Sequence, residues 1–138
     1  MQFQHRFVDS IPKTLEPRIL YIALYCGAVV HLCACGCGNE AVTPLGRTDW
    51  SILYDGESIS LHPSVGNWSF PCRSHYLITN DEIVWAPQWS TEKIEEGRYR
   101  DRTLKGLESP SAGPDASIVE VARPHINLMS RLRGWLRL

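Results

Sequence analysis

The sequence has almost no net charge and no long apolar run. Acidic and basic residues nearly balance over 138 residues, so the formal net charge is −1 at pH 7 and no strong field would attract nucleic acid or an acidic membrane surface. The apolar stretch at residues 19–30 is too short to span a bilayer, and Asp9 and Lys13 interrupt any N-terminal signal peptide. We therefore expect a cytoplasmic protein with no membrane span and no nucleic-acid partner.

The sequence does have five cysteines, and four of them fall in two short motifs. The motifs are His31-Leu32-Cys33-Ala34-Cys35-Gly36-Cys37-Gly38 and Cys72-Arg73-Ser74-His75. In a reducing compartment, clustered cysteines are more often metal ligands or catalytic groups than disulfides. Residues two apart on a strand face the same side, and the interleaved glycines let the chain turn back. Zinc needs four tetrahedral ligands, so we expect the second motif to complete a site that the first motif begins.

The choice of ligands stays open among six side chains. The preferred set is Cys33, Cys35, Cys37 and Cys72, which would form a closed four-thiolate zinc site. Three cysteines with His75 form the alternative, which would remove that histidine from catalysis. Cys26 lies outside the motifs in an apolar segment, and we interpret it as an inert core thiol.

The patterning before residue 90 predicts a mostly β fold, a small antiparallel sheet domain over residues 2–90 that one zinc stabilises. The segments 19–25 and 28–33 are rich in branched and aromatic residues on either side of a glycine, as in paired strands. Asp55-Gly56 and Asn80-Asp81 each separate two such runs and predict two hairpins.

Residues 91–138 have a different composition and predict a loosely packed tail. Its first part is densely charged or rich in proline, glycine and serine, which is typical of a polar linker. After Pro124, apolar residues recur at helical spacing, so we expect a short amphipathic helix at the end of the chain.

The loop at residues 63–71 is dense in hydroxyl, amide and turn-forming residues, and it leads back to the second cysteine motif. Such groups could hydrolyse an amide or ester, with Ser64 or Ser74 as nucleophile and His75 or His31 as base. Asn67, Arg73 or backbone amides near Gly66 could stabilise the oxyanion. The simpler interpretation is that these residues only form turns and balance thiolate charge.

Several strings resemble a bacterial family of small predicted metal-binding proteins that are encoded beside ubiquitin-like proteins and their E1-like and E2-like enzymes. They span residues 6–87 and include the His31 to Gly38 motif, Pro63-Ser64-Val65-Gly66-Asn67-Trp68 and Phe70-Pro71-Cys72-Arg73-Ser74-His75-Tyr76. The chain departs from the family pattern in its extra Cys26 and in Arg18, which stands where we expect glycine.

The resemblance implies a role in a bacterial ubiquitin-like conjugation pathway, in antiviral defence or stress. Its implied partners are the ubiquitin-like protein and the E1-like and E2-like enzymes. The implied activity is that of a zinc-containing peptidase that processes or removes the modifier, using His75 with Ser74 or Ser64, or His31 as a second base. The alternative is a non-catalytic zinc adaptor that recruits E2 or substrate.

Overall fold

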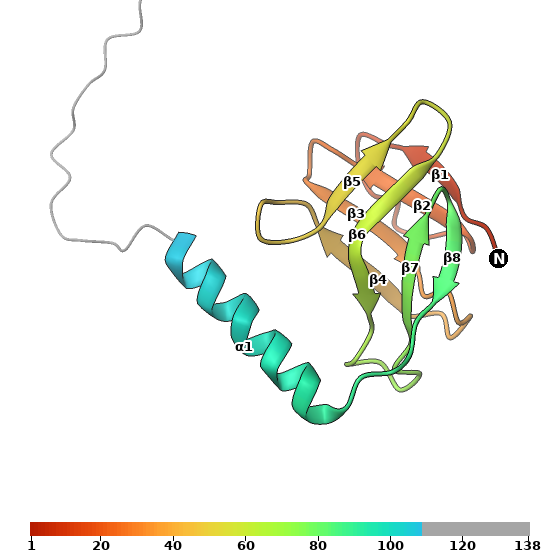
Figure 1. The fold of residues 1–138 in the computed structure, drawn as a ribbon. Coiled ribbons are helices and arrows are strands. Elements are labelled where there is room, and N and C mark those ends of the chain that lie inside the picture. The colour runs from red at the N-terminus through yellow and green to blue at the C-terminus, as the bar shows by residue number, and fades with distance from the viewer. Residues whose placement is uncertain (109–138) are drawn as a thin grey trace, which may run out of the picture.

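The computed structural model describes residues 1–108, which form eight strands and one helix (Figure 1). The elements are β1 (Gln4–Phe7), β2 (Ile19–Ala23), β3 (Ala28–Leu32), β4 (Glu40–Pro44), β5 (Ser51–Tyr54), β6 (Ile59–Gly66), β7 (His75–Thr79), β8 (Glu82–Trp85) and α1 (Thr91–Glu108). One sheet has the order β1-β2-β3-β4 and the other the order β5-β6-β7-β8. β1 and β2 are parallel, whereas every other pair is antiparallel. The mostly β fold is thus confirmed, with two sheets in place of one.

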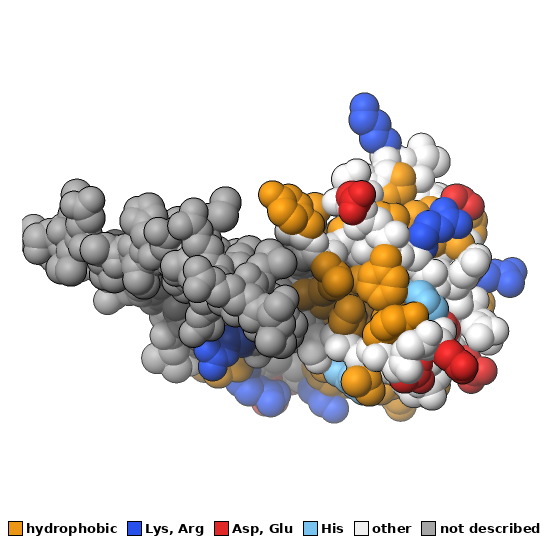
Figure 2. Space-filling model, turned by 90° about the horizontal axis from the view of Figure 1, so that it is seen from above, with side chains coloured by type: hydrophobic (Ala, Val, Ile, Leu, Met, Phe, Trp, Pro, Cys, Tyr) orange, Lys and Arg blue, Asp and Glu red, His pale blue; other side chains and the backbone are white. Residues whose placement is uncertain are grey.

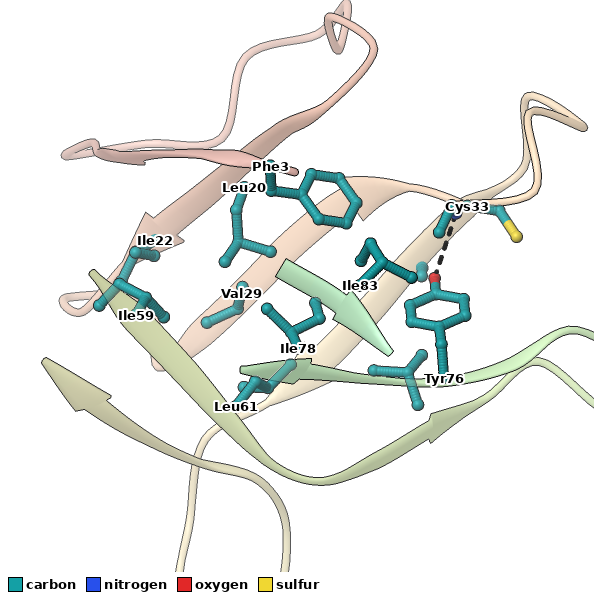
Figure 3. Close-up of a cluster of buried hydrophobic side chains, with 13 residues drawn as sticks. Phe3, Leu20, Ile22, Val29, Cys33, Ile59, Leu61, Tyr76, Ile78 and Ile83 are labelled. Carbon is teal, nitrogen blue, oxygen red and sulfur yellow. Dashed lines mark hydrogen bonds between the residues drawn. The ribbon is translucent and has the colours of Figure 1, made fainter. Parts of the chain in front are cut away.

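The two sheets pack face to face around one hydrophobic core. Figure 3 shows Leu20 and Val29 of the first sheet opposite Leu61 and Ile78 of the second, and all four side chains are fully buried. The outer face of the first sheet is also covered, because Leu15 packs against Tyr21 there. β2 is therefore buried on both faces, which explains its uninterrupted run of apolar residues.

Both predicted hairpins are confirmed. Asn80 and Asp81 have φ values of +50° and +63°, as a two-residue turn with the twist of the flanking strands requires, and they join β7 to β8. The Asp55 carboxylate accepts hydrogen bonds from the amides of Glu57 and Ser58 in the turn between β5 and β6. These hydrogen bonds hold the pKa of Asp55 below its usual value.

The helix α1 was not predicted, because its charge density was interpreted as a polar linker. Glutamate, lysine and arginine are good helix formers even without an apolar stripe. Ser90 caps the helix by accepting a hydrogen bond from the Lys93 amide at 3.3 Å. Ile94 is the buried anchor of this helix, at 4% exposure. The short helix expected after Pro124 lies outside the described residues.

Within residues 1–108, no helix is long and apolar enough to cross a bilayer. Arg18 has a φ of +60°, in the left-handed region that favours glycine. This backbone conformation gives a physical reason to expect glycine at this position.

Candidate functional site

Four cysteines come together at one end of the sandwich. Cys33, Cys35 and Cys37 follow β3, Cys72 precedes β7, and their sulfur atoms all lie within 4.8 Å of one another. The Cys33–Cys72 and Cys37–Cys72 sulfur distances are both 3.8 Å. A tetrahedral zinc with bonds of about 2.3 Å would hold its sulfurs about 3.8 Å apart. These thiols could therefore hold one metal ion, and within the described residues neither His31 nor His75 belongs to the cluster.

The chain supports this thiol cluster with amide and hydroxyl groups. The Ser74 hydroxyl lies 3.0 Å from the Cys33 sulfur, and the Asn67 side-chain amide donates to the same hydroxyl at 3.0 Å. Asn39 donates from its side chain to Cys37 at 3.2 Å. Hydrogen bonds from the backbone and side chain of Asn39 lower the pKa of Cys37 to about 6. At neutral pH the cluster thus offers negative charge to a cation even before metal binding lowers the other thiol pKa values.

Ser64 and His75 meet on the other side of β7. The His75 Nε2 atom lies 2.8 Å from the Ser64 hydroxyl, and His75 Nδ1 lies 2.6 Å from the Pro87 carbonyl oxygen. Because a carbonyl can only accept, Nδ1 carries the proton and Nε2 accepts from Ser64. The neutral tautomer set in this way is the one that a general base needs.

Aromatic rings hold the histidine in place. The Trp68 and Trp89 rings stack on each other at 5.6 Å between centroids, and they lie 5.0 Å and 5.3 Å from the His75 ring. Gly66 makes room for this arrangement, since a Cβ atom there would lie 2.5 Å from the Trp68 ring. The ring of His75 is therefore fixed by packing as well as by its hydrogen bonds, and the residue is 6% exposed.

A cleft of about 370 Å³ opens beside this pair. Three parts of the chain line it: residues 48–50, the end of β6 with Ser64 and Gly66, and the face of α1 that carries Gly97 and Leu104. Lys105 of α1 lies 2.7 Å from the Asp49 carboxylate and joins the helix to the first of these parts. The serine and histidine thus lie in a concave site of the size that takes small ligands or a few peptide residues.

Residues 7–86 match the model of a family described as BubE, the bacterial ubiquitination-like system serine protease. The match covers more than half of the chain. The chain belongs to this family. The resemblance seen in the sequence is thereby confirmed, and the family name supports a protease component of a ubiquitin-like system. No curated protein and no solved structure matches the chain.

The other residues expected to take part in catalysis contact different partners. Ser74 lies just before β7, and its hydroxyl faces the thiol cluster at 3.0 Å from the Cys33 sulfur. His31 is fully buried, with its Nε2 atom 2.9 Å from the Tyr76 hydroxyl. Burial lowers the pKa of His31 to about 4, which makes it a weak base out of reach of solvent. Asn67, expected near the oxyanion, donates instead to Ser74 and Tyr76.

Sequence reasoning also missed some features of the site. Cys26 is exposed in the turn between β2 and β3, so its interpretation as a core thiol was wrong. The roles of Trp68 and Trp89 around His75 were not predicted, although both rings flank the motifs. The helix that forms one wall of the cleft lies beyond the residues matched by the BubE family.

Proposed function

We propose that this chain is a serine peptidase that processes or removes the ubiquitin-like modifier of its own system. The proposal rests on the contact between Ser64 and His75 in the cleft beside α1, together with the family's description as a serine protease. Ser64 is the nucleophile and His75 the general base. The Pro87 carbonyl takes the orienting role that a carboxylate has in a catalytic triad.

In the proposed reaction, the Ser64 oxygen attacks the carbonyl carbon of the scissile amide while His75 Nε2 accepts the hydroxyl proton. His75 then gives this proton to the leaving amine, and an ester to Ser64 remains. A water molecule loses a proton to His75 and attacks the ester carbonyl. His75 returns this proton to the Ser64 oxygen as the ester bond breaks, which restores the serine hydroxyl and releases a carboxyl group that ionises in solvent. The Pro87 carbonyl stabilises the imidazolium that forms twice in the cycle.

The thiol cluster serves structure in this proposal, with zinc as its metal. Cys33, Cys35, Cys37 and Cys72 would fill all four positions of a tetrahedral ion and leave none for substrate. The ion would join the segment after β3 to the segment before β7. The start of β7 is thereby fixed, and with it the position of His75.

Two serine variants test the assignment of the nucleophile. Ser64→Ala should keep its metal and melting temperature while cleavage of the purified modifier precursor falls by at least about a thousandfold. Ser74→Ala should keep cleavage but lose about 1–3 kcal/mol of stability, since a buried hydroxyl between Cys33 and Asn67 is removed.

Ser69→Ala serves as the matched control, because Ser69 is exposed in the loop between Ser64 and Ser74. The assignment is wrong if Ser64→Ala cleaves at the wild-type rate. Loss of cleavage in a stable Ser74→Ala protein would transfer the role to that serine.

An exposed apolar surface favours a second candidate, the non-catalytic adaptor. Phe7 and Tyr54 pack edge to face at 5.3 Å, and they remain 44% and 47% exposed. Tyr25 is 97% exposed in the nearby turn between β2 and β3, and Figure 2 shows hydrophobic side chains gathered at this end of the domain. This end lies opposite the start of β7 (Figure 1). Two results together would support the adaptor: the wild type binds the E2-like enzyme but cleaves nothing, and Tyr54→Ser abolishes this binding.

A further inference from the structure

The strand that carries Ser64 has an open edge. β5 pairs with β6 from Tyr54 opposite Ile59 to Ser51 opposite His62, and β6 then continues to Gly66. Trp50 leaves this register and pairs with Leu45 in an isolated parallel bridge. Among the described residues, Pro63–Gly66 therefore have no partner on the β5 side, whereas Val65 and Gly66 pair with β7 on the other side.

The cleft lies in the gap that β5 leaves. Continuing the antiparallel register would place residues 48–50 opposite residues 63–65, and both segments instead line the cleft from separate sides. An unpaired strand edge presents amide and carbonyl groups that can bind a further strand. The cleft thus combines a nucleophile with a vacant strand position.

We infer that the substrate enters this cleft as an extended peptide and pairs with β6 along Pro63–Gly66, where Pro63 has no N–H and offers only its carbonyl. The inference rests on the proposed function and adds the conformation of the substrate and the surface that recognises it. α1 forms the opposite wall, and the Lys105–Asp49 ion pair joins that wall to residues 48–50. The space between a strand edge and a helix admits one extended chain and excludes a folded surface. The substrate class is therefore a flexible peptide tail.

Strand pairing recognises the amide and carbonyl groups of the substrate main chain, and it contacts these groups at alternate residues. Only alternate residues of an added strand direct their amide and carbonyl groups to its neighbour. Their side chains point alternately to the two faces of the sheet, one of which carries the His75, Trp68 and Trp89 rings. Replacing single amide hydrogens of the peptide should consequently have effects that alternate along its length.

The test uses full-length Ser64→Ala protein and synthetic peptides with the C-terminal sequence of the modifier, each N-methylated at one residue. We expect methylation at alternate residues to raise Kd about five- to tenfold and methylation at the intervening residues to change it little. In hydrogen exchange, those amides of residues 64–66 that face the open edge should be protected when the unmodified peptide is added. The amides of the turn at residues 24–27, beside the exposed apolar surface, should not respond.

Two results would overturn the inference. Binding that no N-methyl group weakens, with cleavage by the wild type intact, would reject strand pairing and leave the peptidase proposal standing. Protection at residues 24–27 in place of residues 64–66 would locate the peptide at the other end of the domain. Absence of both binding and cleavage would reject the inference together with the proposed function.

Discussion

The thiol cluster and the Ser64 cleft lie at the same end of the sandwich, but the chain holds them to different degrees. Around the cluster, Cys35 and Cys37 are exposed, but Cys33, Ser74 and Tyr76 are at most 7% exposed, and each of these three has a polar partner. One wall of the cleft is formed by α1. Among residues 91–106 of this helix, Ile94 is the one buried side chain. The comparison suggests that the tightly held face fixes β7, while the loosely held wall admits a substrate.

Removing a cluster thiol should have the largest effect of the changes considered. Cys72→Ala should lose the metal and the folded state together, because structural zinc contributes about 10–16 kcal/mol in small domains. Metal analysis and circular dichroism of the purified protein measure both. Cys26→Ala is the matched control, since this exposed thiol lies outside the cluster. Metal-free Cys72→Ala protein with a native spectrum would contradict the structural role.

His31 should make stability depend on pH. Its folded-state pKa of about 4 lies below the value of about 6.5 in an unfolded chain, so the unfolded state binds more protons between these values. The free energy of unfolding should fall by up to about 3 kcal/mol as the pH drops from about 6.5 to about 4.

His31→Gln keeps a polar group for Tyr76 but does not titrate in this range. Urea unfolding at several pH values should therefore show a smaller dependence on pH in the variant than in the wild type. Equal slopes would mean that the thiol cluster alone accounts for any acid sensitivity.

Gly66→Ala should damage the cleft face with a moderate effect. The new methyl group would lie 2.5 Å from the Trp68 ring, and displacing that ring should cost about 1–3 kcal/mol. The cleavage rate should fall by more than the loss of folded protein accounts for, because Trp68 packs against His75. Gly106→Ala on α1 has no close neighbour and should leave cleavage unchanged. Steady-state cleavage and thermal melts on both variants decide the point.

The smallest effect is expected at the wall of the cleft. Asp49→Asn removes the ion pair with Lys105, an interaction of about 0–1 kcal/mol at a partly exposed site. The melting temperature should hardly change, whereas KM should rise and become less sensitive to salt. An unchanged KM at low salt would show that α1 does not take part in substrate binding.

Local patterns predicted the hairpins and the two cysteine motifs, because both depend on residue types at short spacing. The joining of the two motifs into one cluster was predicted from the four ligands that zinc needs. The division of the strands into two sheets depends on long-range packing, which no local pattern contains. Ser64 could not be separated from Ser74 for the same reason. The register between β6 and β7 shifts between Leu61 and Val65, and beyond the shift Gly66 pairs with His75. This pairing brings Ser64, which is farther from His75 in the sequence than Ser74, within reach of the histidine. α1 was missed because Ile94 is the one buried side chain among residues 91–106. A helix of this kind has almost no apolar periodicity in its sequence.

The turn that leads into β7 limits how the gene can vary, because Arg73 has a φ of +45° and its amide donates to the Phe70 carbonyl at 3.0 Å. Deleting Arg73 would retain every ligand and both members of the serine–histidine pair, yet it would shift Cys72 by one residue relative to Ser74 and His75. The turn that carries Cys72 toward Cys33 would then lose its residue in the left-handed region, and neither site could form without rebuilding the segment before β7. We expect substitutions to be tolerated at this position far more readily than any change in the length of the segment.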